Sequence, residues 1–112
     1  MTLILRDTKA AAWNGGVTIL REIPEWIIHN PRAEYCKYQP GQSVECKETW
    51  AWDEWYIFKA TQLTEGYIPT GGWHSPVTMP RAAVRRHGVI ESVDVVEKDG
   101  WWWEIKVKEA TP

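Results

Sequence analysis

A carboxylate, a hydroxyl and an indole follow one another at Glu48-Thr49-Trp50, directly after the alternating run 43–47. Lys59 stands in the next β-prone run, and several arginines follow a long loop. A carboxylate or an amine beside a hydroxyl can take part in acid–base or nucleophilic chemistry. Aromatic planes beside a few cations are also what a nucleobase or a single strand requires, because stacking contributes about 1–3 kcal/mol per base.

We expect one cleft to gather the side chains that supply these stacking, cationic and polar groups. The predicted ligand-binding set is Thr18, Arg21, Glu48, Trp50, Lys59, Trp73, Arg81 and Arg85. In this cleft Trp50 and Trp73 are expected to stack on bases. Arg81 and Lys59 are expected to meet phosphate, while Glu48 accepts a hydrogen bond from an exocyclic amine.

Catalysis has weaker support than binding. Glu48 and Lys59 are the candidate bases, with Thr18 or Thr49 as a polar partner, but nothing in their spacing requires that role. The three histidines lie outside Ser-His-Asp, Cys-His and HExxH settings, and the chain has neither a P-loop nor a GxGxxG motif. We therefore assign no catalytic residue, expect no cofactor, and lean against an enzyme.

Tryptophan is the unusual part of the composition, with nine in 112 residues beside a single phenylalanine. Nine indoles are more than a core of this size needs, so we expect a few to line a groove. The alternative is that they form the core beneath an ordinary solvated surface. The formal net charge of −2 argues against a wide basic face that holds duplex DNA, but it leaves room for a local basic patch.

The remaining bulk features point to one cytoplasmic domain over residues 1–112, which we expect to be monomeric. Cys36 and Cys46 lie ten residues apart without a CxxC motif, so we expect two free thiols and no metal site. No apolar run approaches the roughly 18 residues of a membrane span. The first thirteen residues are too short and too charged for a signal peptide.

The first half of the chain predicts short elements. Residues 2–6 alternate like a strand, and residues 7–14 favour a short helix capped by Asp7 or Thr8 and ended by Gly15 and Gly16. Residues 17–21 form a strand or an extended connection. Two prolines then allow at most one helical turn before residue 31.

The clearest local signals lie at a turn and in the C-terminal third. Pro40-Gly41 fits the centre of a type II turn that leads into a strand with Val44 and Cys46 on one face. Residues 54–60 are β-prone, and 61–76 read as a long loop.

Two strands, 89–97 and 101–108, follow around a Lys-Asp-Gly turn. The core face of the second strand consists of Trp101, Trp103, Ile105 and Val107. The chain is thus predicted to be mostly β (α+β), a small and mainly antiparallel barrel of five to six strands with one or two short helices.

Four segments resemble small phage and prophage proteins with an ASCH domain, a branch of the PUA-like superfamily. They are YQPGQSVECKETW (38–50), FKA (58–60), WHSPVTMPRAAVR (73–85) and GGVTILREIP (15–24). For the first three segments the family pattern reads Y-x-P-G-D with V-R-E-T-W, then Y-K-A, then W-x-P-S-I-H-M-P-R-W-A-S-R. The segment 15–24 is similar to the family's G-R-K-T-x-T-R-R-V-I near the N-terminus. The resemblance implies a PUA-like barrel with a cleft beside the early helix, of a kind associated with RNA, modified bases or nucleosides.

Departures from the family pattern weaken the case for catalysis. In members that hydrolyse acylated cytidine, an early lysine and a threonine carry the chemistry. An ungapped match puts Val17 at the position of the lysine and Leu20 at that of the threonine. Of the family's early motif, only Thr18 and Arg21 are retained. Ala82 replaces the tryptophan after the M-P-R motif.

Three functions follow, in order of preference. The first is a phage-type binding module for RNA, single-stranded nucleic acid or a nucleoside, acting in the host cytoplasm if it is phage-encoded. The second is an amidohydrolase on a modified nucleoside such as N4-acetylcytidine, with Lys59 or Lys47 replacing the missing lysine. The third is a phage accessory protein that binds a host protein.

Overall fold

The computed structural model describes residues 1–62 and 66–111. Its regular elements are strands, one short α-helix and single 3-10 turns. The strands and the helix are β1 (Thr2–Ile4), α1 (Asp7–Ala11), β2 (Gly16–Glu22), β3 (Ser43–Lys47), β4 (Trp50–Asp53), β5 (Trp55–Phe58), β6 (Arg86–Glu97) and β7 (Trp101–Glu109). The 3-10 turns are η1 (Glu25–Ile27), η2 (Ala33–Tyr35), η3 (Lys59–Thr61), η4 (Pro76–Thr78) and η5 (Arg81–Ala83).

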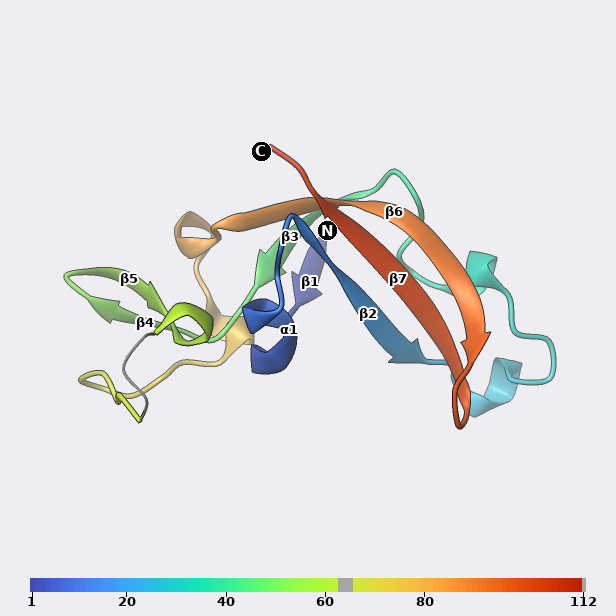
Figure 1. Cartoon of the computed structure of the whole chain (residues 1–112), viewed down its shortest axis with the longest axis horizontal. Coiled ribbons are helices and arrows are strands. Elements are labelled where there is room, and N and C mark those ends of the chain that lie inside the picture. The colour runs from blue at the N-terminus through green and yellow to red at the C-terminus, as the bar shows by residue number, and fades with distance from the viewer. Residues whose placement is uncertain (63–65, 112) are drawn as a thin grey trace.

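Five strands form one mixed sheet in the order β1-β3-β6-β7-β2 (Figure 1). The β1–β3 pair is parallel and the other neighbours are antiparallel. Strand β6 organises the sheet, because its first four residues pair with β3 while Gly88–Glu97 pairs with β7 across a register shift between Ile90 and Ser92. Strands β4 and β5 form a separate hairpin.

The main core lies against one face of this sheet. Side chains that alternate inward along β7 are buried there, including Trp103, Ile105 and Val107, as their period-2 spacing predicted. Val44 and Cys46 of β3 are buried because they too alternate onto the core face, which confirms the predicted face of that strand. Both cysteines are free thiols, as expected.

A second, smaller cluster supports the hairpin. Met79, Ala83 and Val84 are buried together and pack against partly buried aromatic side chains of β4 and β5. The hairpin projects beyond the end of the sheet (Figure 1), and the molecule measures 49 × 29 × 22 Å. Its radius of gyration of 15.6 Å exceeds the about 13 Å typical of a compact chain of this length, so the shape is elongated.

The mostly β prediction with a short early helix is confirmed, but several details differ. Neither Asp7 nor Thr8 caps α1, whose N-cap is Arg6 without a side-chain hydrogen bond. The helix ends at Ala11, ahead of the glycines expected to stop it. The β-prone run 54–60 is a strand only to Phe58, since η3 begins at the next residue.

The predicted barrel is not closed by strand pairing. In residues 1–62 and 66–111, β1 and β2 are the two edges of the sheet and no ladder joins them. The three-residue β1 is too short to form an extended second ladder, and Tyr38 reaches the same edge, where its hydroxyl donates to the Thr2 carbonyl at 2.9 Å.

Two further expectations concern the loop and the membrane. The predicted loop 61–76 includes residues 63–65, which lie outside the described residues; η4 begins at its last residue. No described helix is long and apolar enough to span a bilayer.

The turn at Pro40-Gly41 offers a test of a purely local constraint. Gly41 has φ 88°, and the Gln42 N–H donates to the Gln39 carbonyl at 3.2 Å, which confirms the type II turn. An added Cβ meets no atom within 4 Å. Gly41→Ala should therefore lower the free energy of unfolding by about 1–2 kcal/mol through backbone conformation alone, as measured by urea denaturation.

Gly41→Asn is the matched variant for this turn, because asparagine tolerates the left-handed region better than alanine. We expect a smaller loss for Asn than for Ala. Equal losses would contradict the conformational explanation.

Candidate functional site

Glu48 is the one buried charged side chain in the described residues, with 0% of its surface exposed. It follows the end of β3, and Arg85 binds it in a two-pronged contact. The Arg85 Nη2 atom lies 2.8 Å from Oε1 and Nε lies 3.1 Å from Oε2. Arg86 adds a second cation, with Nε 3.7 Å from Oε2. Both carboxylate oxygens are thus engaged, which suits a structural ion pair more than a free base.

The two arginines extend this ion pair to neighbouring elements. Arg86 donates to the Ala10 carbonyl of α1 and lies over the Trp13 ring. Burial lowers the pKa of Arg86, while the Glu48 carboxylate acts in the opposite direction. The Arg85 guanidinium lies 4.1 Å from the centroid of the Phe58 ring at the end of β5. The group therefore ties β3, α1 and the hairpin to the start of β6.

A second polar group adjoins the first through Thr49. The Thr49 hydroxyl donates to Asp7 Oδ1 at 2.7 Å, and Lys59 Nζ lies 3.2 Å from Asp7 Oδ2. The Thr49 hydrogen bond and, to a lesser degree, Lys59 lower the pKa of Asp7. Asp7 thus holds α1 to the β3–β4 connection and to η3, instead of capping its own helix.

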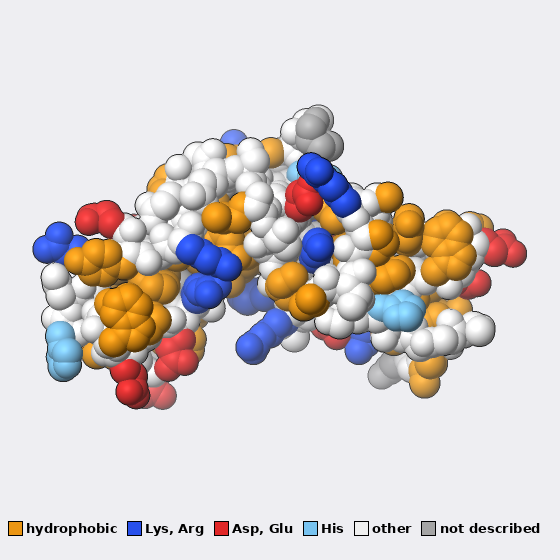
Figure 2. All heavy atoms as spheres, turned by 180° about the vertical axis from the view of Figure 1, so that it is seen from behind, with side chains coloured by type: hydrophobic (Ala, Val, Ile, Leu, Met, Phe, Trp, Pro, Cys, Tyr) orange, Lys and Arg blue, Asp and Glu red, His pale blue; other side chains and the backbone are white. Residues whose placement is uncertain are grey.

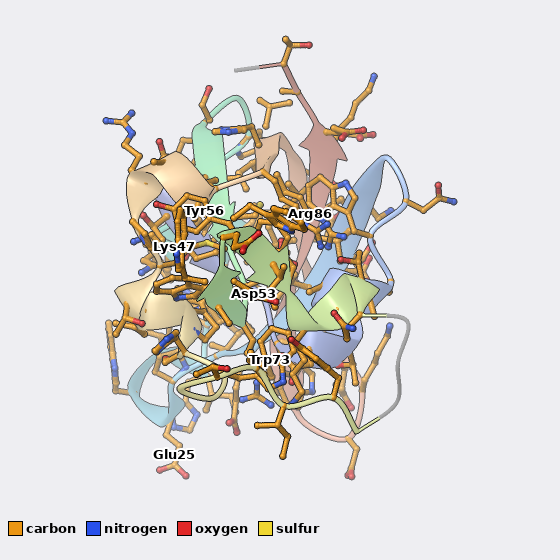
Figure 3. The ribbon with its side chains drawn as sticks, turned by 90° about the vertical axis from the view of Figure 1, so that its left-hand side faces the viewer. Glu25, Lys47, Asp53, Tyr56, Trp73 and Arg86 are labelled. Atoms are coloured by element: carbon orange, nitrogen blue, oxygen red, sulfur yellow. The ribbon has the colours of Figure 1, made fainter. Side chains whose placement is uncertain are left out.

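Trp50 and Trp73 both have engaged indole N–H groups. Trp50 Nε1 donates to the Ser75 carbonyl at 3.2 Å, and its ring lies 4.7 Å from the His74 ring. Trp73 Nε1 donates to the Tyr67 carbonyl at 3.2 Å. In the view of the hairpin end, Trp73 lies well apart from Arg86, on the other side of the hairpin (Figure 3). Both predicted stacking residues are therefore held by hydrogen bonds to backbone carbonyls.

The other predicted residues lie in three different hollows. Thr18 lines a groove with Lys9 and Lys106. Arg81 lines a second hollow, where its Nε lies 2.8 Å from the Glu45 carboxylate. Arg21 lines a groove at the open edge of the sheet. Of the predicted set, the structure joins Glu48 to Arg85, and it brings Lys59 to the adjoining group through Asp7 and Thr49.

The groove that holds Arg21 is the strongest candidate site. It lies between the unpaired edges of β1 and β2 and has a volume of about 480 Å³. Its lining residues are Thr2, Leu3, Ile4, Ile19, Leu20, Arg21, Lys37, Tyr38, Lys47, Val77 and Ile105. Three of them are cations and none is a carboxylate. The groove thus combines three cations with a largely apolar lining.

The cations of this groove come from three separate segments. Arg21 and Lys37 flank the buried Tyr38 ring, at 5.8 Å and 5.1 Å from its centroid. Lys47 is the last residue of β3. Sequence reasoning missed Lys37 as a ligand-binding residue, and its one signal was its place beside the tyrosine of the Tyr-x-Pro-Gly turn. On the face opposite to Figure 1, Lys and Arg side chains lie across the middle, with hydrophobic groups toward both ends (Figure 2).

Comparison of the chain with protein-family models, curated proteins and solved structures finds no match. Within the described residues there is also no group of three or more His, Cys, Asp or Glu side chains placed to hold a metal ion. The candidate site is thus defined by its geometry and charge.

The buried carboxylate predicts a large stability effect. Glu48→Gln leaves two guanidinium groups without a counter-charge, and breaking a buried pair in this way costs about 3–5 kcal/mol in the free energy of unfolding. Urea denaturation measures this loss, as a lower midpoint at an unchanged m-value.

Glu45→Gln is the matched control for that variant, because its partner Arg81 is 87% exposed. Exposed pairs contribute about 0–1 kcal/mol, so the control should be close to wild type. Equal losses in the two variants would show that burial of Glu48 is not the cause.

The lowered pKa of Asp7 predicts a pH dependence with a definite sign. A carboxyl whose pKa is lower in the folded state stabilises the fold above its ordinary value of 3.8, and that contribution is lost as the pH falls through the folded value. The difference in free energy of unfolding between wild type and Asp7→Asn should therefore shrink as the pH is lowered from about 7 to about 3.

Thr49→Val tests the principal cause of this shift. Removal of the hydroxyl should raise the pKa of the Asp7 carboxyl, followed by NMR titration of its side-chain carbon. An unchanged titration would exclude Thr49 as the stabilising partner.

Proposed function

We propose that this protein binds single-stranded nucleic acid in the groove between β1 and β2. The observation that carries the proposal is the lining of this groove, where the described residues include the cations Arg21, Lys37 and Lys47 and no carboxylate. A phosphate chain requires such a local excess of positive charge. The formal net charge of −2 disfavours a broad duplex-binding face, so a narrow groove is the better fit.

The apolar lining suits the bases and sugars of the same ligand. Ile4 and Leu20 are both partly exposed within the groove, and Val77 of η4 is 71% exposed at its rim. From Val77 the chain runs back to His74, which lies against the Trp50 ring. A strand that leaves the groove there meets aromatic planes on the hairpin, where stacking tolerates any base.

The same proposal includes membership of the ASCH branch of the PUA-like superfamily. The four sequence motifs support it, as does a mostly β domain with a short helix beside the sheet. The PUA-like barrel then has its opening between β1 and β2. Because both oxygens of Glu48 are held by Arg85, the geometry favours a binding module over an amidohydrolase.

A salt titration tests the proposal directly. Fluorescence anisotropy of labelled 12-nucleotide RNA and DNA oligomers gives the binding constant at several salt concentrations. For three phosphate contacts to a single strand, log K should fall with log[salt] with a slope of about −2. Arg21→Gln, Lys37→Gln and Lys47→Gln should each weaken binding and reduce the magnitude of that slope by about 0.7.

Lys98→Gln is the matched control, because Lys98 pairs with Glu104 outside the groove. It should leave both the affinity and the slope unchanged. If poly-glutamate of the same length binds as tightly as the oligomers, the groove recognises an acidic chain and the proposal fails. No binding of either oligomer at low salt would also overturn it.

A further inference from the structure

A second hollow lies between the turns η1 and η2, at the opposite end of the molecule from the β4–β5 hairpin (Figure 1). Its volume is about 520 Å³, and its lining consists of Trp26, Ile27, His29, Asn30 and Tyr35. Among residues 1–62 and 66–111, neither a lysine or arginine nor a carboxylate contributes to its lining. This hollow therefore differs in chemistry from the cationic groove between β1 and β2.

The two aromatic side chains of this hollow are unusually accessible. Trp26 is 81% exposed and Tyr35 is 49% exposed. Neither belongs to a core cluster, so the fold gains little from either ring. Large aromatic side chains left in water around a hollow are typical of an interaction site.

The polar groups around this hollow are not used by the fold. Four indoles, those of Trp50, Trp73, Trp102 and Trp103, donate to backbone carbonyls, whereas the Trp26 indole is among those that do not. Within residues 1–62 and 66–111, the side chains of Trp26, His29, Asn30 and Tyr35 form no hydrogen bond to protein. Several donors thus surround one apolar hollow with their hydrogens available to a ligand.

The backbone under these side chains is held in place. Ile27 packs against the main core, and Cys36, directly after Tyr35, is buried in it. The Gln39 amide donates to the carbonyls of Ala33 and Cys36 at 3.1 Å and 2.6 Å, which fixes η2. The exposed rings therefore stand on turns that are anchored to the core, and this lowers the ordering cost of binding.

We propose that this hollow binds a proline-rich peptide in the polyproline II conformation. Proline has no backbone N–H, so such a peptide offers apolar rings and carbonyl acceptors and needs only donors in return. Polyproline II has no internal hydrogen bonds, which leaves those carbonyls free, and aromatic-lined grooves recognise it. The uncharged lining fits a neutral ligand of this kind.

A stacked nucleobase fits the same hollow less well. Base edges carry donors next to acceptors, and a strand brings phosphates for which this lining offers no cation. The peptide site is therefore independent of the proposed nucleic-acid groove, and either can fail without the other.

The test uses an acetylated and amidated deca-proline peptide with the full chain. The Nε1–H signals of the tryptophans are followed in 1H–15N NMR spectra, with Trp26 assigned by its loss in Trp26→Ala. We expect the peptide to shift the Trp26 signal in a saturable way. Trp26→Ala should weaken binding at least about tenfold, as expected for a central tryptophan of an interface.

Two more variants make the result specific. Tyr35→Phe removes one donor and keeps the ring, so it should weaken binding by a smaller factor than Trp26→Ala. Trp52→Ala is the matched control, because Trp52 is 56% exposed on the distant hairpin, and it should change the affinity less than about twofold.

Three outcomes would overturn the proposal. One is an unchanged Trp26 signal at saturating deca-proline. Another is equal affinity for a Gly-Ser peptide of the same length, which would exclude recognition of proline. The last is a Trp26 shift with single-stranded oligonucleotide but none with peptide, which would assign the hollow to bases instead.

Discussion

The buried contact between Glu48 and the two arginines at the start of β6 is the interaction on which the arrangement of this molecule depends. A carboxylate with no exposed surface needs its counter-charges in place, because an unpaired buried charge costs several kcal/mol. Glu48 follows the last residue of β3 and precedes the hairpin, while Arg85 and Arg86 join η5 to the sheet. The ion pair therefore joins the segment between β3 and the hairpin to the start of β6, and it leaves Glu48 no free oxygen for acid–base chemistry.

The incomplete closure of the sheet decides where a ligand can bind. Two edge strands face the groove, and the short β1 leaves space that side chains only partly fill. Tyr38 occupies the base of that space, and the cations stand around it. The tryptophans divide in a similar way. Those whose N–H reaches a carbonyl serve the fold, whereas the exposed Trp26, Trp52 and Trp55 belong to neither core cluster, and of these three Trp26 lines a hollow.

Local patterns predicted the elements well and the site less well. Alternation in β7 identified its buried face, and Pro40-Gly41 identified the turn before β3, since both depend on residues close in sequence. The early helix was placed correctly, but its expected cap was wrong, because Asp7 bonds to Thr49 across 42 residues instead of to its own backbone. A cap prediction considers only residues close in sequence, whereas the Asp7 carboxylate accepts its hydrogen bond from the distant Thr49 hydroxyl.

The order of residues along the chain was enough to establish a small β-rich domain with a short helix, a type II turn and two free thiols. Period-2 spacing and turn chemistry act over a few residues and can be read without knowledge of the rest. Tertiary structure decided which of the predicted residues meet. Glu48 pairs with Arg85, and Arg81 pairs with Glu45. Arg21 lies with Lys37 and Lys47 in the groove at the open edge of the sheet. The physical reason is that ion pairing and sheet closure depend on the register of strands far apart in sequence, which no local pattern encodes.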